Sequence, residues 1–289
     1  MEAPRTIRPG DGPYPAALAR AADRPSELRL VGSLGEPRAR VAVVGARLTD
    51  EYGADLARAL GEGLARAGVS VVSGGARGVD AAAHEGALSA GGHTVAVLGT
   101  GVDVVYPAEH RGLFDRIVAA GGALVSEQPD GTPGWRRNFP RRNRIISGMS
   151  DAVVVVRAGE RSGALVTASW ARSQGVPVLA VPGDVRDALS AGPLRLLREG
   201  ARVAATAEDV LAAIGIAAGA DDAPRQAELP ALGAAESALL SALARRPRHA
   251  GEVARAAGLA PGAALAGLLA LEIQGLCEQR PGHYFLRRI

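Results

Sequence analysis

The stretch Val41-Ala42-Val43-Val44, followed by Gly45-Ala46-Arg47, sets the pattern that decides the fold of this 289-residue chain. A short run of β-branched and other apolar residues, bounded by glycine, is typical of a buried strand. Because such a strand is apolar on both faces, it predicts a parallel sheet that is covered on two sides. Similar runs follow at Val69 to Val72, Thr94 to Leu98, Ala123 to Val125, Ala152 to Val156 and Val176 to Val181.

Segments of helical periodicity, rich in Ala, Leu and Arg, separate these runs. We expect helices over Asp50 to Ala67, Val79 to Ala90, Ala108 to Ala120, Pro140 to Met149, Gly163 to Gln174 and Thr206 to Ile214. Strands that alternate with helices predict an α/β fold with a doubly wound, mostly parallel sheet. Ligands of such sheets bind beyond the carboxyl ends of the strands, near a switch in strand order.

A different pattern begins after Ile216, where the sequence becomes polar and is punctuated by Pro and Gly. Three helical pieces and two strand-like runs follow, at Ala234 to Arg245, Ala250 to Ala257, Gly262 to Gln274, Gly275 to Gln279 and His283 to Leu286. Three helices and a hairpin in this order predict a small C-terminal winged-helix domain. The predicted domains are an N-terminal extension packed on the body (1–40), the α/β body (41–216), a linker (217–232) and the winged helix (233–289).

The composition excludes several kinds of chemistry. The chain has no lysine, which excludes a Walker A ATPase and pyridoxal chemistry. Its basic residues are arginines, whose planar forks match phosphate oxygens in a bidentate fashion. Cys277 is the only cysteine, so we expect neither a disulfide nor a cysteine-based zinc site. Neither a leader peptide nor a membrane span is recognisable, and we therefore expect a cytoplasmic protein.

The segment from Trp135 to Arg144 combines arginines with aromatic side chains. Its arginines are Arg136, Arg137, Arg141, Arg142 and Arg144. Pro140 suits the first position of a helix, so three of these arginines fall in its opening turns, where they oppose the helix dipole. This placement favours a bound anion such as phosphate, and Phe139 offers a face on which a base could stack. A solvated basic turn with two core aromatics is the structural alternative.

Glycine-containing loops follow the predicted strands. Arg47 stands where a dinucleotide-binding fingerprint would carry its second glycine, so the fingerprint is absent and nicotinamide binding is disfavoured. The loop Ser73 to Gly78 again pairs glycines, which allow close backbone approach, with an arginine. Ser162 caps a helix that opens with small residues, which leaves an N-terminus ready for an anion. A plain turn and simple helix capping remain the alternatives for these two loops.

Catalytic constellations are scarce. Asp80 and His84 lie four residues apart on one predicted helix, a spacing that favours a hydrogen-bonded pair anchoring the fold. The sequence has neither a G-x-S-x-G nucleophile elbow nor an H-E-x-x-H metal motif. We therefore expect a protein without enzyme activity, bound metal or cofactor.

The ordered string of these motifs resembles the DprA family, the DNA-processing proteins of bacterial transformation. The matching motifs are Gly45-Ala46-Arg47, Ser73 to Asp80 with His84, Gly101-Val102-Asp103 with Tyr106-Pro107, Ser126-Glu127, Phe139 to Arg144, Ser162-Gly163 with Thr167-Ala168, and Pro182-Gly183. They lie between about Tyr14 and Ala201, and the C-terminal tail resembles the family's winged helix. Arg157 and Leu194 depart from the pattern, because an acidic residue and Asn are common there.

The resemblance implies an extended Rossmann-like fold and a homodimer formed through that domain. It also implies sequence-independent binding and protection of single-stranded DNA, and delivery of this DNA to the RecA recombinase. The family's DNA contacts carry over to Arg47, Arg136, Phe139, Arg142, Asn143, Arg144, Ser162 and Gly163. The loops described above add Gly45, Ser73, Gly74, Arg77, Arg141 and Thr167 as predicted DNA-binding residues.

Two rival functions come from other classes of protein. A nucleotide N-glycosidase or phosphoribohydrolase needs a P-G-G-x-G-T-x-x-E loop that supplies a carboxylate, whereas Ser162 to Thr167 contains no Glu. A winged-helix transcriptional regulator would read duplex DNA with its third helix. That helix, Ala263 to Leu271, has no arginine to read a base, and we expect it to contact protein instead.

Overall fold

A computed structural model describes residues 3–217, 232–244 and 246–287 of the chain, and every structural statement below refers to these residues. They form two units, divided between Ala223 and Pro224. Residues 218–231 of the predicted linker (217–232) and the predicted helix end at Arg245 lie outside the described residues.

The first unit is built on a nine-stranded sheet with the strand order β1-β2-β6-β5-β4-β3-β7-β8-β9. Its strands are β1 (Arg5–Ile7), β2 (Leu28–Gly32), β3 (Ala39–Val44), β4 (Val69–Ser73), β5 (Thr94–Leu98), β6 (Ala123–Ser126), β7 (Ala152–Val155), β8 (Val178–Ala180) and β9 (Arg202–Val203). Neighbouring strands are parallel from β6 to β9 and antiparallel on either side of β2. The predicted doubly wound, mostly parallel sheet is confirmed.

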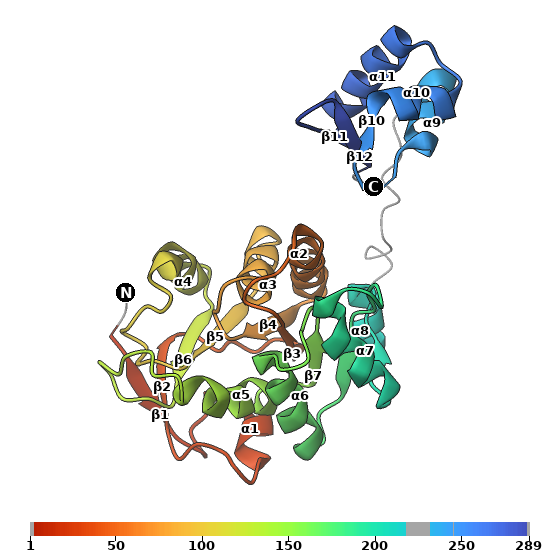
Figure 1. Cartoon of the computed structure of the whole chain (residues 1–289). Helices are drawn as coiled ribbons and strands as arrows, with labels where there is room; N and C mark the ends of the chain where they lie inside the picture. Colours follow the sequence, from red (N-terminus) through yellow and green to blue (C-terminus); the bar gives the residue numbers. More distant parts are fainter. Residues whose placement is uncertain (1–2, 218–231, 245, 288–289) are drawn as a thin grey trace. The chain divides into compact units, whose positions relative to one another are not determined.

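Helices cover both faces of this sheet (Figure 1). On one face lie α2 (Glu51–Arg66), α3 (Val79–Ser89), α4 (Arg111–Ala119) and α8 (Ala207–Ala213), and on the other α1 (Ala16–Arg20), α5 (Asn138–Gly148), α6 (Gly163–Ser173) and α7 (Ala191–Arg198). Alternate residues of β3 enter the two cores, because successive side chains of a strand point to opposite faces. Val41 and Val43 pack with α2 and α3, whereas Ala42 and Val44 pack with α5 and α6. The sheet is thus buried on both sides, as its apolar strands predict.

The strand order reverses at the centre of the sheet. Strands β3, β4, β5 and β6 proceed in one direction, and the chain then crosses through α5 to place β7 on the other side of β3. Loops that follow β3 and β7 diverge at such a switch point and leave a crevice between them. The carboxyl ends of these two strands are therefore where a ligand site is expected.

The structure corrects several predicted boundaries. Helix α5 begins at Asn138, so Pro140 occupies its third position rather than its first. A proline is tolerated there because the amides of the first helical turn have no partner within the helix. The predicted helix from Ala108 begins as a 3-10 turn, and α4 starts only at Arg111. The sequence analysis does not predict β1 and β2, because β2 forms by pairing with β6, far along the chain, and β1 pairs only with β2.

The second unit is a winged helix, as predicted. It contains α9 (Ala234–Ala242), β10 (Arg248–His249), α10 (Ala250–Ala257), α11 (Pro261–Ile273), β11 (Cys277–Arg280) and β12 (Tyr284–Arg287), with the sheet order β10-β12-β11. Leu268 and Phe285 lie in its core. The Cys277 thiol is also buried there and donates to the Leu268 carbonyl at 3.3 Å, and burial raises the pKa of this thiol to about 11.

Among the described residues no single helix has the length and apolar character needed to cross a membrane. Helices α10 and α11 reach that length only together, and a bend of 104° separates them.

Candidate nucleic-acid interface

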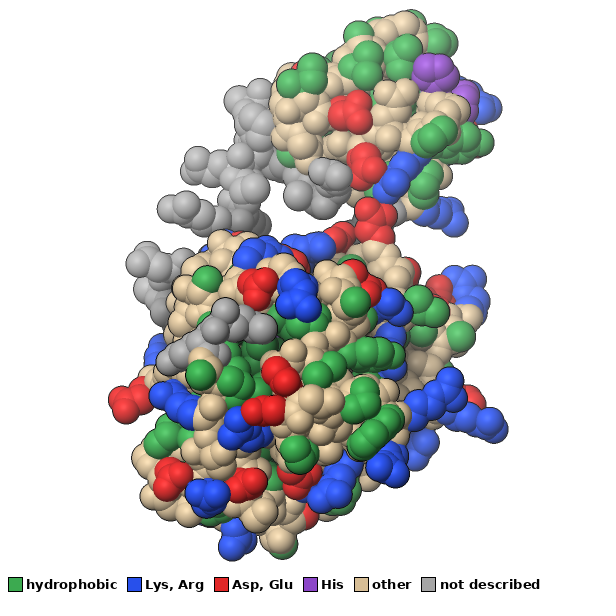
Figure 2. Space-filling view, turned by 90° about the vertical axis from the view of Figure 1, so that its left-hand side faces the viewer, with side chains coloured by type: hydrophobic (Ala, Val, Ile, Leu, Met, Phe, Trp, Pro, Cys, Tyr) green, Lys and Arg blue, Asp and Glu red, His purple; other side chains and the backbone are tan. Residues whose placement is uncertain are grey.

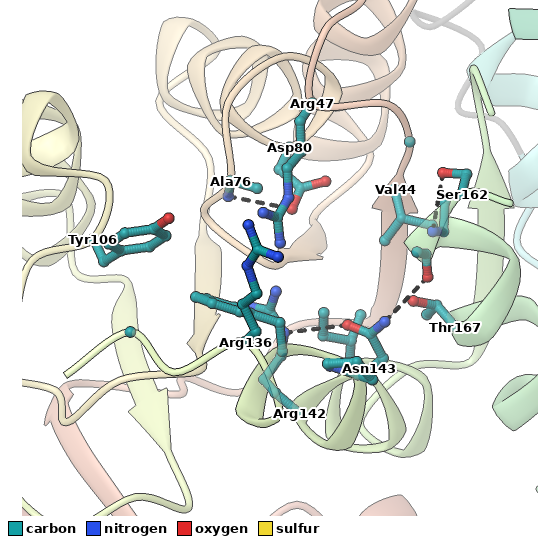
Figure 3. A pocket seen from close by; sticks show the side chains of 17 residues that line it. Val44, Arg47, Ala76, Asp80, Tyr106, Arg136, Arg142, Asn143, Ser162 and Thr167 are labelled. Atoms are coloured by element: carbon teal, nitrogen blue, oxygen red, sulfur yellow. Dashed lines mark hydrogen bonds between the residues drawn. The ribbon is translucent and has the colours of Figure 1, made fainter. Parts of the chain in front are cut away.

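An open pocket of about 560 Å³ lies at the carboxyl ends of β3 and β7, at the predicted switch point. Its walls come from the loop after β3, the loop before α5 and the beginnings of α5 and α6. Figure 3 shows the Arg47 and Arg136 side chains reaching toward each other across it, with Tyr106 on one side and Ser162 and Thr167 on the other. Two exposed guanidinium groups from separate loops therefore converge on one cavity.

Aromatic rings line the same pocket. The central guanidinium carbon of Arg47 lies 5.0 Å from the centroid of the Phe139 ring, within the range of a cation–π contact. The Phe139 and Tyr106 rings are 5.3 Å apart and tilted by 36°. Phe139 packs closely on Gly99, where an added Cβ would meet the ring at 2.7 Å. The pocket thus combines positive charge with a flat apolar surface large enough for a nucleobase.

The α6 side of the pocket presents a helix N-terminus. Ser162 caps α6 by accepting a hydrogen bond from the Ala164 amide at 3.3 Å, while Gly163 is exposed and has no atom within 4 Å of where its Cβ would stand. Asn143 of α5 donates to the Gly163 carbonyl at 3.1 Å and so ties the two helices together. Thr167, one turn further along α6, is buried in the wall. A small anion can approach this helix end without obstruction.

Arg142 also lines the pocket, but its guanidinium is directed into the protein. It is 6% exposed, and its Nη1 donates to the Gly74 carbonyl at 2.6 Å and to the Val97 carbonyl. Burial lowers the pKa of Arg142 to about 10, although the nearby Asp80 carboxylate opposes that shift. Asp80 in turn accepts the Gly74 amide at 3.1 Å and the Ala76 amide at 3.3 Å. Burial raises the pKa of Asp80, and Arg142 opposes the rise. Because both buried groups bond to the backbone of Gly74, they support the loop that borders the pocket.

Arg141 and Arg144 lie outside the pocket and share one carboxylate. The side chain of Arg144 is 9% exposed and pairs with Glu127, which Arg141 also approaches, at 3.2 Å. Two further predicted residues, Ser73 and Arg77, also differ in burial. Ser73 is buried and donates to the Val43 carbonyl at 2.7 Å, whereas Arg77 is exposed and pairs with Glu109.

A smaller hollow of about 270 Å³ adjoins the pocket and shares Arg47 and Phe139 with it. Gly74 and Arg77 line this hollow. The structure therefore gathers Gly45, Arg47, Gly74, Arg77, Arg136, Phe139, Arg142, Asn143, Ser162, Gly163 and Thr167 around two adjoining cavities, and leaves Ser73, Arg141 and Arg144 outside them.

The sequence interpretation did not include Tyr106 and Asp80 among the binding residues. Tyr106 lies in the segment between β5 and α4 and precedes a proline, and its place in the motif Tyr106-Pro107 was the available signal. The expected hydrogen bond between Asp80 and His84 is not formed. The His84 Nδ1 lies 2.7 Å from the Thr94 hydroxyl, and burial lowers the pKa of His84 to about 3. No group of three potential metal ligands occurs among the described residues.

Outside the pocket, charges of opposite sign are mixed. On the face of the body shown in Figure 2, basic and acidic side chains are interspersed. Surface pairs such as Arg8 with Glu27 and Arg116 with Glu85 neutralise charge locally. The convergence of Arg47 and Arg136, rather than the net charge of the chain, makes the pocket a candidate for binding a polyanion.

These features define a Rossmann-like α/β protein with a cationic, aromatic-lined pocket at the switch point of its sheet and an added winged-helix domain. The family model described as "DNA recombination-mediator protein A" matches residues 5–233, and that of the "DprA winged helix domain" matches residues 223–283. The chain belongs to the DNA recombination-mediator protein A, or DprA, family.

Individual relatives agree with this assignment. A putative DNA processing protein DprA from Mycobacterium tuberculosis is 46% identical over 255 residues, which are 87% of this chain and 65% of the relative. The chain thus spans just under two thirds of that relative. The structure of DprA from Streptococcus pneumoniae matches with a TM-score of 0.67 at 38% identity, covering 72% of this chain and 73% of that one. A structure of DprA from Helicobacter pylori, described for its single-stranded DNA binding mode, matches with a TM-score of 0.65 at 27% identity. The match covers 73% of this chain and 95% of that one.

Proposed function

We propose that this protein binds single-stranded DNA without sequence preference and that the binding site is the pocket between β3, α5 and α6. The observation that carries the proposal is the meeting of Arg47 and Arg136 beside the Phe139 ring at an open helix N-terminus. Single strands are commonly held by such a combination of backbone charge contacts and base stacking. Because a stacking face accepts any base, this mode of binding carries little sequence information.

In this binding mode, backbone phosphates contact the Arg47 and Arg136 guanidinium groups and the N-terminus of α6. One base turns toward Phe139 and Tyr106. The buried Arg142 and Asp80 hold the floor of the pocket, and their bonds to the backbone of the loop after β4 keep that floor in place.

Membership of the DprA family supports a wider proposed role. The protein protects incoming DNA and loads the RecA recombinase on it during natural transformation or recombination, acting as a cytoplasmic homodimer formed through its Rossmann-like domain. It does so as a binding protein rather than an enzyme. The winged helix contacts a protein, because α11 has no arginine and exposes Leu269 and Ile273 instead. The names and DNA-related descriptions of the relatives support this role.

The direct test is the affinity for a labelled dT oligomer, measured over a series of salt concentrations and compared with duplex of equal length. Three phosphate contacts give a slope of about −2 in a plot of log affinity against log salt, or roughly a twentyfold loss between 50 and 200 mM. Single strands should bind more tightly than duplex, and Arg47→Ala should weaken binding on the order of tenfold.

Arg66→Ala provides the control. Arg66 ends α2 at the opposite edge of the sheet, where it pairs with Glu62 on the surface. A preference for duplex, or an Arg47→Ala protein that binds as tightly as its parent, would contradict the proposal.

A further inference from the structure

Arg157 is a buried arginine just after β7, outside the pocket, that bonds to three different loop residues. It is only 3% exposed. Its Nη2 donates to the Asp50 carboxylate at 2.7 Å and to the Asp187 carboxylate, and its Nη1 donates to the Ser190 hydroxyl at 2.8 Å. Asp50 precedes α2, whereas Asp187 and Ser190 lie between β8 and α7. One guanidinium therefore connects two loops at the carboxyl edge of the sheet.

The backbone of Arg157 holds the start of the loop that carries Arg47. The Arg157 carbonyl accepts a hydrogen bond from the Ala46 amide at 2.6 Å. A Cβ added at Gly45 would stand 2.9 Å from that carbonyl oxygen, which shows how closely the two segments are packed.

The side chain of Arg157 holds the end of the same loop. Asp50 caps α2 by accepting the Gly53 amide at 3.0 Å with one carboxylate oxygen, and its other oxygen receives the Arg157 guanidinium. Only Arg47, Leu48 and Thr49 lie between the two anchored residues, Ala46 and Asp50. Both ends of this three-residue segment are thus fixed by a single residue.

The charges make the guanidinium necessary for this arrangement. Arg157 stands between two carboxylates, and without it Asp50 and Asp187 would repel each other across the gap. Asp50 would then keep only its capping bond to the Gly53 amide and would lose the ion pair that ties the end of the segment carrying Arg47 to the residue after β7. The Tyr52 ring, 5.6 Å from the guanidinium carbon, covers a further side of the cation.

We propose that Arg157 is a positioning residue that holds Arg47 in the DNA-binding pocket by fixing both ends of the loop between β3 and α2. This inference rests on the proposed function of the pocket. Arg157 itself is buried and does not line the pocket, so any effect on DNA binding must pass through the loop.

The test compares four proteins, the parent, Arg157→Met, Arg47→Ala and the double variant, for binding to a dT oligomer over a salt series. If Arg157 acts through Arg47, Arg157→Met weakens binding on the order of tenfold and reduces the salt slope by about 0.7, the value of one lost phosphate contact. The double variant binds no more weakly than Arg47→Ala alone. An unchanged salt slope, or a double variant in which the two losses multiply, would overturn the proposal.

Arg40→Met is the matched control for simple destabilisation. Arg40 is partly buried and donates to the Leu34 carbonyl at 2.9 Å, but it lies near the amino end of β3, away from the pocket. Its removal should lower thermal stability while leaving the salt slope of DNA binding unchanged. Arg157→Lys keeps the charge between the two carboxylates and should restore most of the affinity that Arg157→Met loses.

Amide hydrogen exchange in the free protein separates this inference from the proposed function. Arg157→Met should accelerate exchange at Gly53, whose amide Asp50 accepts, and Arg40→Met should not. If the parent fails to bind the oligomer, the proposed function is wrong, and exchange alone then decides whether Arg157 holds the loop. Should Arg157→Met not fold, Asp50→Asn takes its place, because Asn retains a capping oxygen but loses the ion pair.

Discussion

The Nη1 atom of Arg142 lies 2.6 Å from the carbonyl oxygen of Gly74, in the loop after β4. The basic segment around α5 therefore serves two purposes. Arg136 extends into the pocket from the loop before the helix, whereas Arg142 fixes the backbone beneath it. The two arginines should respond differently to substitution.

Arg142→Met should unfold the protein more readily than Arg136→Met. Removing Arg142 leaves Asp80 as an uncompensated buried carboxylate and leaves two carbonyl groups without a donor. The free energy of unfolding should fall by about 3 kcal/mol or more. Arg136 is exposed, so its substitution should change stability by no more than about 0.5 kcal/mol while weakening DNA binding. Urea unfolding checks the pair, and equal losses of stability would refute the distinction.

Two glycines of the pocket, Gly45 and Gly163, should also differ in how much their substitution by Ala changes stability. A Cβ at Gly45 would stand 2.6 Å from Val79 and 2.9 Å from the Arg157 carbonyl oxygen, so Gly45→Ala should cost about 1–3 kcal/mol through overpacking. Gly163 has nothing within 4 Å of its Cβ position and begins α6. Gly163→Ala should therefore leave the melting temperature unchanged or raise it slightly. A Gly45→Ala protein that melts with its parent would show that the loop after β3 can shift freely.

His84 should make the stability of the protein depend on pH. Burial lowers its pKa from 6.5 to about 3 in the folded state, whereas the unfolded chain takes up a proton near pH 6.5. Below that pH the unfolded state binds more protons than the folded state, so the free energy of unfolding falls as the pH decreases toward 3. Above about pH 7 both states are neutral at this group, and no stability is lost through it. Between pH 7 and pH 5, His84 should lower the free energy of unfolding by about 2 kcal/mol.

The difference between the parent and His84→Gln isolates this effect from that of the carboxylates. The variant should lose less stability than the parent between pH 7 and pH 5. His283→Gln, at an exposed position of the winged helix, should behave as the parent does. Identical pH profiles for the parent and His84→Gln would rule out the buried imidazole as the source.

The sequence predicts the sheet well and the contacts of individual arginines poorly, for physical reasons. Strand β5 matches its predicted residues, Thr94 to Leu98, because a fully buried strand must be apolar throughout. Strand β1, with three residues, has no such signature, because it forms only by pairing with β2. Placing Arg47 at the ligand-binding edge required only that the carboxyl ends of parallel strands gather there.

The orientation of the α5 arginines depends on partners that local sequence does not reveal. Arg144 points away from the pocket because Glu127 receives it, and Arg142 points inward because two carbonyl groups accept it. A count of arginines in a motif therefore overestimates the number that can contact DNA. The helix begins two residues earlier than Pro140 suggests, which also changes the faces that these side chains occupy.

The buried Cys277 gives the winged helix a built-in reporter. With a pKa of about 11, only about one thiol in ten thousand is ionised at pH 7, and the sulfur is enclosed by the domain core. A thiol-specific reagent can thus react at an appreciable rate only when that domain transiently opens. Since the chain has no other cysteine, the labelling rate measures the opening of the winged helix alone, in the intact protein and without any added probe.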